Sequence, residues 1–138
     1  MITLPIPHFY VDKVWSRVGK ILQPAVDLQD GYRLEDVKAE IKHRNWQLWV
    51  GADSDDEVLV VAVTRIEIYP RKKACVICFL AGTEMPKWKH LLGDIEDWAV
   101  QNGCTELEIQ GRKGWVREMK DFTHTDVVCY KKIGGDHV

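Results

Sequence analysis

Two glutamates in the second half of the chain are the first candidates for chemistry. Glu106 and Glu108 alternate with the apolar residues Leu107 and Ile109, a pattern typical of a strand with one polar face. A carboxylate on such a strand could take a proton from an amine through a water molecule, as a general base does. The pair could equally be the solvated face of a half-buried strand, because charged side chains on strands are usually exposed. The residues alone leave both interpretations open.

A basic turn follows this strand. The segment Gly111–Arg117 reads Gly-Arg-Lys-Gly-Trp-Val-Arg and so gathers three cations and an aromatic ring. Cations at the C-terminal end of a strand suit a phosphate group or an acidic partner surface. The alternative is a surface turn whose Trp115 packs into the core. A second basic run, Arg71–Lys73, is predicted to be a solvated turn.

The sequence predicts no metal or redox site. Cys75 and Cys78 have C-x-x-C spacing, but they lie in an apolar run of strand character, where residues three apart face opposite sides. The cysteines are therefore expected to be buried thiols: Cys75, Cys78, Cys104 and Cys129. The five histidines are scattered, and no two have the spacing of metal ligands.

The composition fits one globular domain, expected to span residues 1–138. Hydrophobic residues make up 46% of the chain, and the formal net charge of −2 gives no general attraction to nucleic acid or membrane. No apolar run approaches the roughly 20 residues that a membrane helix needs. The start of the chain has neither the basic nor the apolar region of a signal peptide. We therefore expect the protein in the cytoplasm.

Helical periodicity marks the elements that must position these residues. In 11–26 and 34–43, apolar residues recur every three or four positions, as on one buried helix face. The clearest helix opens at 81–83, with Thr83 as its N-cap, and stops at Asn102–Gly103, where glycine supplies a left-handed residue. A short helix is also predicted over residues 113–122.

The remaining segments predict strands. Residues 45–51 and 57–69 flank a polar turn and should form a hairpin. The run 74–80 is almost wholly apolar, as expected for a central strand that is buried on both faces. Further strands are predicted at 105–110 and 126–133.

These elements define the fold class. The unit from 74 to 110 is β-α-β and should contain parallel strands, whereas 45–80 should be an antiparallel meander. Residues 1–7 contain two prolines and suit an edge strand at best. The prediction is an α+β fold with one mixed sheet that carries helices on both faces.

This order of elements resembles the GNAT superfamily of N-acetyltransferases over nearly the whole chain. The match is densest over 74–133, where Ile95–Ile109 looks like the family's helix after the fourth strand, its turn and its fifth strand. The segment Gly111–Arg117 is similar to a variant in small GNAT-like proteins encoded by phages and prophages. The resemblance implies that the central strands splay apart and that acetyl-CoA lies between them.

The resemblance also implies which residues would bind acetyl-CoA. The fourth strand would offer backbone groups to the pantetheine arm. The following loop and helix N-terminus would bind the pyrophosphate, because free N–H groups and the helix dipole favour anions. On this sequence the implied cofactor-binding residues are Phe79, Leu80, Ala81, Gly82, Thr83, Glu84, Met85, Lys87 and Arg112.

The sequence departs from the family pattern at two places. The phosphate loop of the family is rich in small residues, whereas 81–87 has one glycine, an acid at Glu84 and a proline at Pro86 that lacks an N–H. The family's proton-donating tyrosine position falls near Met119, so Tyr130 is the nearest candidate phenol. The candidate catalytic residues are therefore Glu108 and Tyr130.

Two functions follow from this pattern. The first is an N-acetyltransferase that moves an acetyl group from acetyl-CoA to an unknown amine by direct attack on the thioester. The second is a GNAT-like protein that has lost catalysis and serves as a binding or assembly protein of a phage, either as a component of the virion or in its morphogenesis, with a phage or host protein as its partner.

Overall fold

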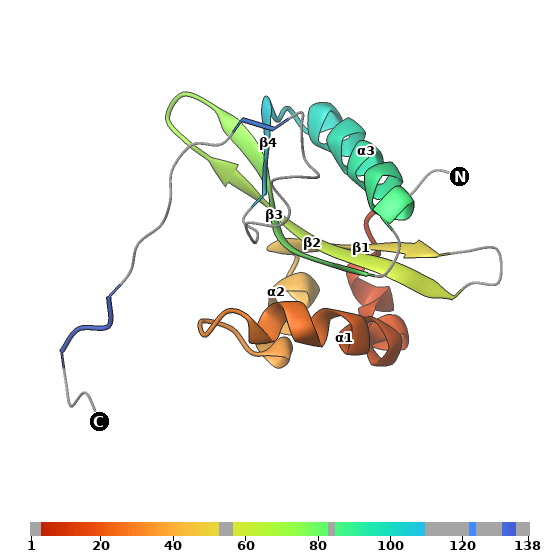
Figure 1. Cartoon of the computed structure of the whole chain (residues 1–138). Coiled ribbons are helices and arrows are strands. Elements are labelled where there is room, and N and C mark those ends of the chain that lie inside the picture. Colours follow the sequence, from red (N-terminus) through yellow and green to blue (C-terminus); the bar gives the residue numbers. More distant parts are fainter. Residues whose placement is uncertain (1–3, 53–56, 83–84, 110–121, 124–130, 135–138) are drawn as a thin grey trace.

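A four-stranded sheet organises the chain in the computed structural model, which describes residues 4–52, 57–82, 85–109, 122–123 and 131–134 (Figure 1). The strands lie in chain order and are β1 (Trp46–Ala52), β2 (Val58–Ile68), β3 (Lys73–Gly82) and β4 (Glu106–Ile109). Neighbours β1 and β2, and β2 and β3, are antiparallel. Strands β3 and β4 are parallel. The structure confirms the predicted meander and the parallel β-α-β unit.

Helices cover both faces of this sheet (Figure 1). On one face lie α1 (Val11–Asp27) and α2 (Leu34–Lys42), preceded by the short 3-10 helix η1 (His8–Tyr10); α3 (Met85–Gln101) lies on the other. The left-handed stop of α3 is confirmed, since Gly103 has a φ of +81°. None of the described helices is long and apolar enough to span a membrane.

Each face of the sheet has its own hydrophobic core. The first core, under α1 and α2, contains these buried residues: Val11, Val14, Val18, Leu22, Val26, Val37, Ile41, Trp46, Leu48, Val61, Val63, Val76, Cys78 and Phe79. The second core, under α3, contains Trp49, Val60, Ala62, Cys75, Ile77, Leu80, Leu91, Leu92, Ile95, Ala99 and Cys104. Strand β3 contributes to both, which confirms its prediction as a central strand buried on both faces.

Two segments differ from the sequence predictions. Ala81 and Gly82 were expected to open the third helix, but they extend β3, because the pairing with β2 continues to Gly82 opposite Val60. Residues 4–7 form no strand. The Ile6 N–H donates to the Leu48 carbonyl at 2.7 Å, and the flanking prolines have no N–H with which to extend this pairing.

The predicted last strand, 126–133, falls mostly outside the described residues. Its described part, 131–133, is not in a strand. Ile133 there is 83% exposed, so this end of the segment has no apolar face buried against the sheet. The helix predicted at 113–122 also lies outside the described residues, except for Phe122, which packs against the second core.

Candidate active site

The C-terminal half of β3 has a free edge in the described structure. Strand β4 pairs with β3 only from Ala74 to Ile77, where it reaches Ile109. On its other side, β3 continues against β2 as far as Gly82. Because alternate backbone groups of a strand point to either side, residues 78–82 present N–H and C=O groups that no described strand pairs. Such an edge can bind an extended ligand through main-chain hydrogen bonds.

A β-bulge marks the beginning of this free edge. Val63 lies opposite Phe79, but the next residue, Thr64, lies opposite Ile77, so Cys78 is the additional residue on β3. As a result, Cys78 and Phe79 are consecutive yet both pack in the first core. A bulge bends its strand and disrupts the local pairing. The bend therefore begins at the residue after the last β3–β4 pair.

Gly82 leads from the free edge toward α3. Its φ of +156° lies in a region that glycine adopts and L side chains rarely do. Helix α3 begins three residues later at Met85, and the first N–H groups of a helix have no partner within it. Strand edge and helix N-terminus therefore follow one another along the chain, which is the order that the sequence resemblance implied for the acetyl-CoA site.

The structure describes only some of the predicted cofactor-binding residues. Phe79 and Leu80 are 4% and 7% exposed and point into opposite cores, so backbone rather than side chain is available there. Ala81 and Gly82 are half-buried. Met85 and Lys87 are placed as part of the α3 backbone only. Predictions for Thr83, Glu84, Arg112 and Tyr130 fall outside the described residues.

Glu108 is placed on the same sheet face as α1 and α2. It lies opposite Val76, which belongs to the first core, and one residue before the end of the β3–β4 pairing. Its side chain is half-buried and accepts a hydrogen bond from the Tyr69 hydroxyl at 3.3 Å. Burial and this hydrogen bond to a carboxylate both raise the pKa of Tyr69.

Glu106 has different surroundings. It is exposed and forms an ion pair with Lys72 at 2.7 Å between Nζ and Oε2. Glu106 therefore fits the interpretation of a solvated strand residue. Its ion pair with Lys72 links the turn before β3 to β4. No sequence pattern indicated Tyr69, because Tyr69 is 39 residues from Glu108 and only the strand register brings the two together.

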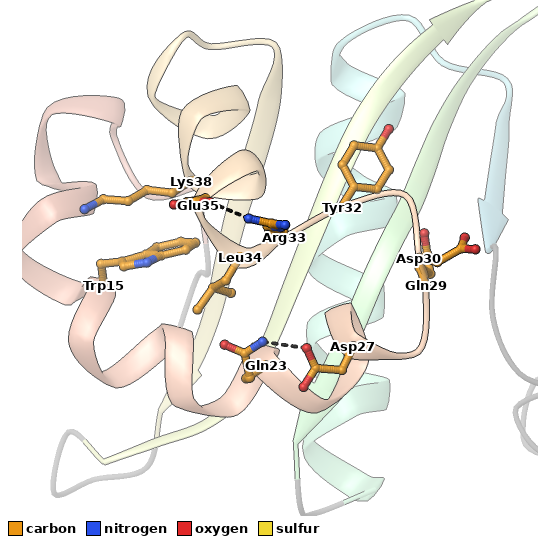
Figure 2. A pocket seen from close by; sticks show the side chains of 10 residues that line it. All are labelled: Trp15, Gln23, Asp27, Gln29, Asp30, Tyr32, Arg33, Leu34, Glu35 and Lys38. Carbon is orange, nitrogen blue, oxygen red and sulfur yellow. Dashed lines mark hydrogen bonds and ion pairs between the residues drawn. The ribbon is translucent and has the colours of Figure 1, made fainter. Parts of the chain in front are cut away.

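The loop between α1 and α2 forms a hollow of about 630 Å³ that the sequence did not predict (Figure 2). It is lined by Trp15, Gln23, Asp27, Gln29, Asp30, Tyr32, Arg33, Leu34, Glu35 and Lys38. Tyr32 also packs edge-on against Trp46 and Phe79, with ring centroids 5.2 and 6.1 Å apart. Through Tyr32, this loop therefore contacts Phe79, the residue that follows the bulge on β3.

The described cysteines are buried thiols. Cys75 and Cys78 point into opposite cores, as their spacing predicted. Burial raises the pKa of Cys75 to about 12 and also raises the pKa of Cys78, even though the Arg65 guanidinium beside Cys78 acts in the opposite direction. Neither thiol is a thiolate nucleophile at neutral pH. Within the described ranges, no three His, Cys, Asp or Glu side chains form a group that could hold a metal ion.

Comparisons with known proteins bear on the fold. No protein-family profile and no curated protein sequence matches this chain significantly. Solved structures, in contrast, do match this chain. An aminoglycoside acetyltransferase from an uncultured soil metagenomic sample, in complex with sisomicin, has a TM-score of 0.71 at 13% identity, covering 96% of this chain and 95% of its own. A probable acetyltransferase has a TM-score of 0.71 at 11% identity, covering 99% and 100%.

A third similar structure carries the fold's name. It is a GNAT family acetyltransferase from Staphylococcus aureus, with a TM-score of 0.67 at 15% identity, covering 96% of this chain and 98% of that one. This chain has the GNAT fold. The sequence resemblance predicted that β3 corresponds to the fourth strand of this fold and β4 to the fifth. At these identities the likeness concerns the fold, and activity must be argued from the site.

Proposed function

We propose that this GNAT-fold chain is an N-acetyltransferase that moves an acetyl group from acetyl-CoA to an amine. The observation that carries the proposal is the free edge of β3 beyond Ile77, which runs through a bulge and Gly82 toward the N-terminus of α3. The amide groups of pantetheine can pair with that edge, and the helix N-terminus favours the pyrophosphate. Acetyl-CoA is an intracellular metabolite, so the proposal assigns the chain to the cytoplasm.

The reaction would be direct transfer between the two substrates. The amine nitrogen attacks the thioester carbonyl, the new C–N bond forms, and the C–S bond breaks to release the CoA thiolate. A backbone N–H near the bulge would stabilise the negative charge that develops on the carbonyl oxygen. In this proposal Glu108 accepts the proton of the amine through a water molecule. Tyr130 is the proposed proton donor to the thiolate.

Two carboxylates on one face of the sheet are consistent with an amine acceptor. Glu67 and Glu108 lie on the face that α1 and α2 cover, in alternate rows opposite Ala74 and Val76. The similar structure that contains sisomicin is named as an aminoglycoside acetyltransferase, and aminoglycosides are amines. The departures at Glu84 and Pro86 favour the alternative, a GNAT-fold protein without activity that binds a partner, for example in phage assembly.

Calorimetric titration with acetyl-CoA, with CoA in a parallel titration, distinguishes the two candidates. We expect binding at micromolar strength, and we expect Gly82→Val to abolish it because valine does not adopt the backbone angle of Gly82. Gly93→Ala is the matched control, since Gly93 lies exposed in α3 with open space around it. Absence of heat at about 1 mM acetyl-CoA would overturn the acetyltransferase proposal and favour the binding protein.

The acetyl-transfer activity of two variants tests Glu108 as the general base. Glu108→Gln should lower kcat by about 10²- to 10⁴-fold, the usual contribution of a general base, without changing acetyl-CoA affinity. Glu106→Gln is the control, because Glu106 lies on the same strand but is ion-paired with Lys72. Equal activity of the two variants would remove Glu108 from the mechanism.

A further inference from the structure

Arg65 lies in the same cross-strand row as Glu108. Trp46 of β1 pairs with Arg65 of β2, Arg65 with Val76 of β3, and Val76 with Glu108 of β4. Trp46 and Val76 belong to the first core, so the whole row faces α1 and α2. Adjacent strands are about 4.8 Å apart. The backbones of Arg65 and Glu108 are therefore separated by about 10 Å, two strand spacings.

The guanidinium of Arg65 is only partly engaged by the residues that the structure describes. Its side chain is 27% exposed. Nη1 donates to the Cys78 sulfur at 3.2 Å, and Nε lies 3.6 Å from Glu67 Oε2, an ion-pair distance that is too long for a hydrogen bond. A thiol sulfur is a weak acceptor, and a guanidinium has five N–H donors. Most donors of this half-buried cation therefore have no oxygen acceptor among the described residues.

The position of Arg65 connects it to the proposed reaction. Its partner Cys78 is the bulged residue at which the free edge of β3 begins. The rings of Tyr32, Trp46 and Phe79 form an aromatic wall beside Arg65. The Tyr32 ring packs against Phe79 and against Trp46, which is the β1 neighbour of Arg65. The close-up shows that Tyr32 comes from the loop that joins α1 to α2 (Figure 2). A ligand there would meet a cation, an aromatic surface and the Glu108 carboxylate together.

We propose that Arg65 binds a carboxylate of the acceptor, so that the acceptor is an amine with a neighbouring carboxylate, as in a free α-amino acid. This inference rests on the proposed function and narrows its substrate. Guanidinium and carboxylate form paired, charge-assisted hydrogen bonds. The acceptor carboxylate lies against Arg65, its nitrogen points toward Glu108, and its side chain packs on the aromatic wall. Arg65 is a specificity-determining residue in this arrangement.

A matched pair of acceptors tests the inference. Phenylalanine and phenethylamine share the ring and the amine and differ by one carboxylate. Acetyl transfer is measured through the free thiol of the CoA that it releases. We expect wild-type protein to favour phenylalanine in kcat/KM by about 10- to 100-fold, the effect of one charge-assisted interaction. Arg65→Gln should abolish this preference, mainly through KM, and Arg65→Lys should restore part of it.

The same comparison of phenylalanine with phenethylamine provides a control variant and the results that would contradict the inference. Lys72→Gln removes a neighbouring cation that is paired with Glu106 and should leave the preference unchanged. Equal or better use of phenethylamine by wild-type protein would overturn the inference while leaving the acetyltransferase proposal intact. A preference that survives in Arg65→Gln would also overturn it.

Direct binding separates this inference from the proposed function. Phenylalanine is titrated into wild-type, Arg65→Gln and Arg65→Lys protein without acetyl-CoA, after circular dichroism has shown that each variant is folded. Binding that is lost in Arg65→Gln and partly kept in Arg65→Lys supports the carboxylate site even if acetyl-CoA does not bind. Equal phenylalanine affinity in all three proteins, or no binding to any of them, would overturn it.

Discussion

Glu106 and Glu108 are two positions apart on one strand, yet their side chains differ in exposure and in partners. Glu106 makes an exposed ion pair with Lys72, and such pairs contribute little to stability. Glu108 is half-buried beside a phenol. A hydrogen-bond donor can hold a carboxylate in one orientation, which a base needs. The difference comes from the register of β4 against β3 and from the turn after β2, which places Tyr69 beside Glu108.

The contact between Tyr69 and Glu108 predicts a change in tyrosine titration. Burial first, and then the hydrogen bond to Glu108, raise the pKa of Tyr69. Glu108→Gln removes the charged partner, so the pKa of Tyr69 should fall part of the way toward its ordinary value of about 10. Ultraviolet difference titration checks this, and Tyr69→Phe identifies the signal. An unchanged titration in Glu108→Gln would show that the two side chains do not interact.

The same shift predicts a dependence of stability on pH. Since its pKa is raised in the folded state, Tyr69 keeps its proton to higher pH in the native protein than in the unfolded chain. The stability it contributes is present below the ordinary tyrosine pKa of about 10 and is lost as the pH rises through the folded value. Urea unfolding across this range should show a smaller loss in Glu108→Gln than in wild-type protein.

A buried hydrogen-bonded chain links β1 and β2. The indole N–H of Trp49 donates to the Thr64 hydroxyl at 3.0 Å, and that hydroxyl donates to the Gln47 side-chain oxygen at 2.8 Å. Trp49 and Thr64 are both 0% exposed. Thr64→Val keeps the shape but leaves the indole N–H unpaired, which should lower the free energy of unfolding by about 1–3 kcal/mol.

A double-mutant cycle gives the control for this chain. In a Trp49→Phe background no indole N–H is left to be unpaired, so Thr64→Val should cost less there than in wild-type protein. Denaturant unfolding measures all four proteins. Identical costs in the two backgrounds would contradict the proposed role of the hydrogen bond.

At the scale of elements, two glycines show how packing decides the effect of the same substitution. A Cβ on Gly51 of β1 would lie 2.5 Å from Val60 Cγ1, and Val60 is fully buried. A Cβ on Gly93 of α3 would have nothing within 4 Å. Gly51 therefore lets β1 and β2 approach at the end of their ladder, whereas Gly93 only weakens its helix.

Alanine should have opposite effects at these two positions. Gly51→Ala overpacks the edge of the second core and should destabilise the protein by about 1–3 kcal/mol. Gly93→Ala should stabilise it by about 0.5–1 kcal/mol, because alanine is the better helix former and restricts the unfolded chain. Urea midpoints of the two variants check this. Stabilisation by Gly51→Ala would show that Val60 moves aside without cost.

In the molecule as a whole, one sheet is shared by two hydrophobic cores. Adjacent residues of β3 serve both cores, since Val76 belongs to the first and Ile77 to the second. Because the same backbone carries both side chains, neither core can lose its sheet face alone. Each core also contains a buried tryptophan, Trp46 in the first and Trp49 in the second.

This arrangement predicts a single unfolding transition. Val76→Ala and Ile77→Ala open cavities in different cores, and Ile77→Ala should cost about 2–5 kcal/mol. Both should move one common transition, with circular dichroism and tryptophan fluorescence coinciding. Two separated transitions in either variant would show that the faces unfold independently.

Local sequence patterns predicted the helices α1, α2 and α3, the four strands of the sheet and the fold class. Helical and alternating apolar periods reflect the geometry of a single element, so they can be interpreted without knowing its neighbours. The wholly apolar run 74–80 predicted a central strand, and Gly103 predicted the stop of α3. C-x-x-C spacing on a strand was enough to place Cys75 and Cys78 on opposite faces.

The end of β3 and the side chains that meet on the sheet depend on pairing between segments that are distant in the sequence. Ala81 and Gly82 extend β3 because Val61 and Val60 of β2 continue the ladder beside them, and no local pattern reveals a partner. The row from Trp46 through Arg65 and Val76 to Glu108 depends on three registers at once. Arg65 and Tyr69 therefore had no sequence signal, since their importance lies in neighbours 13 and 39 residues away.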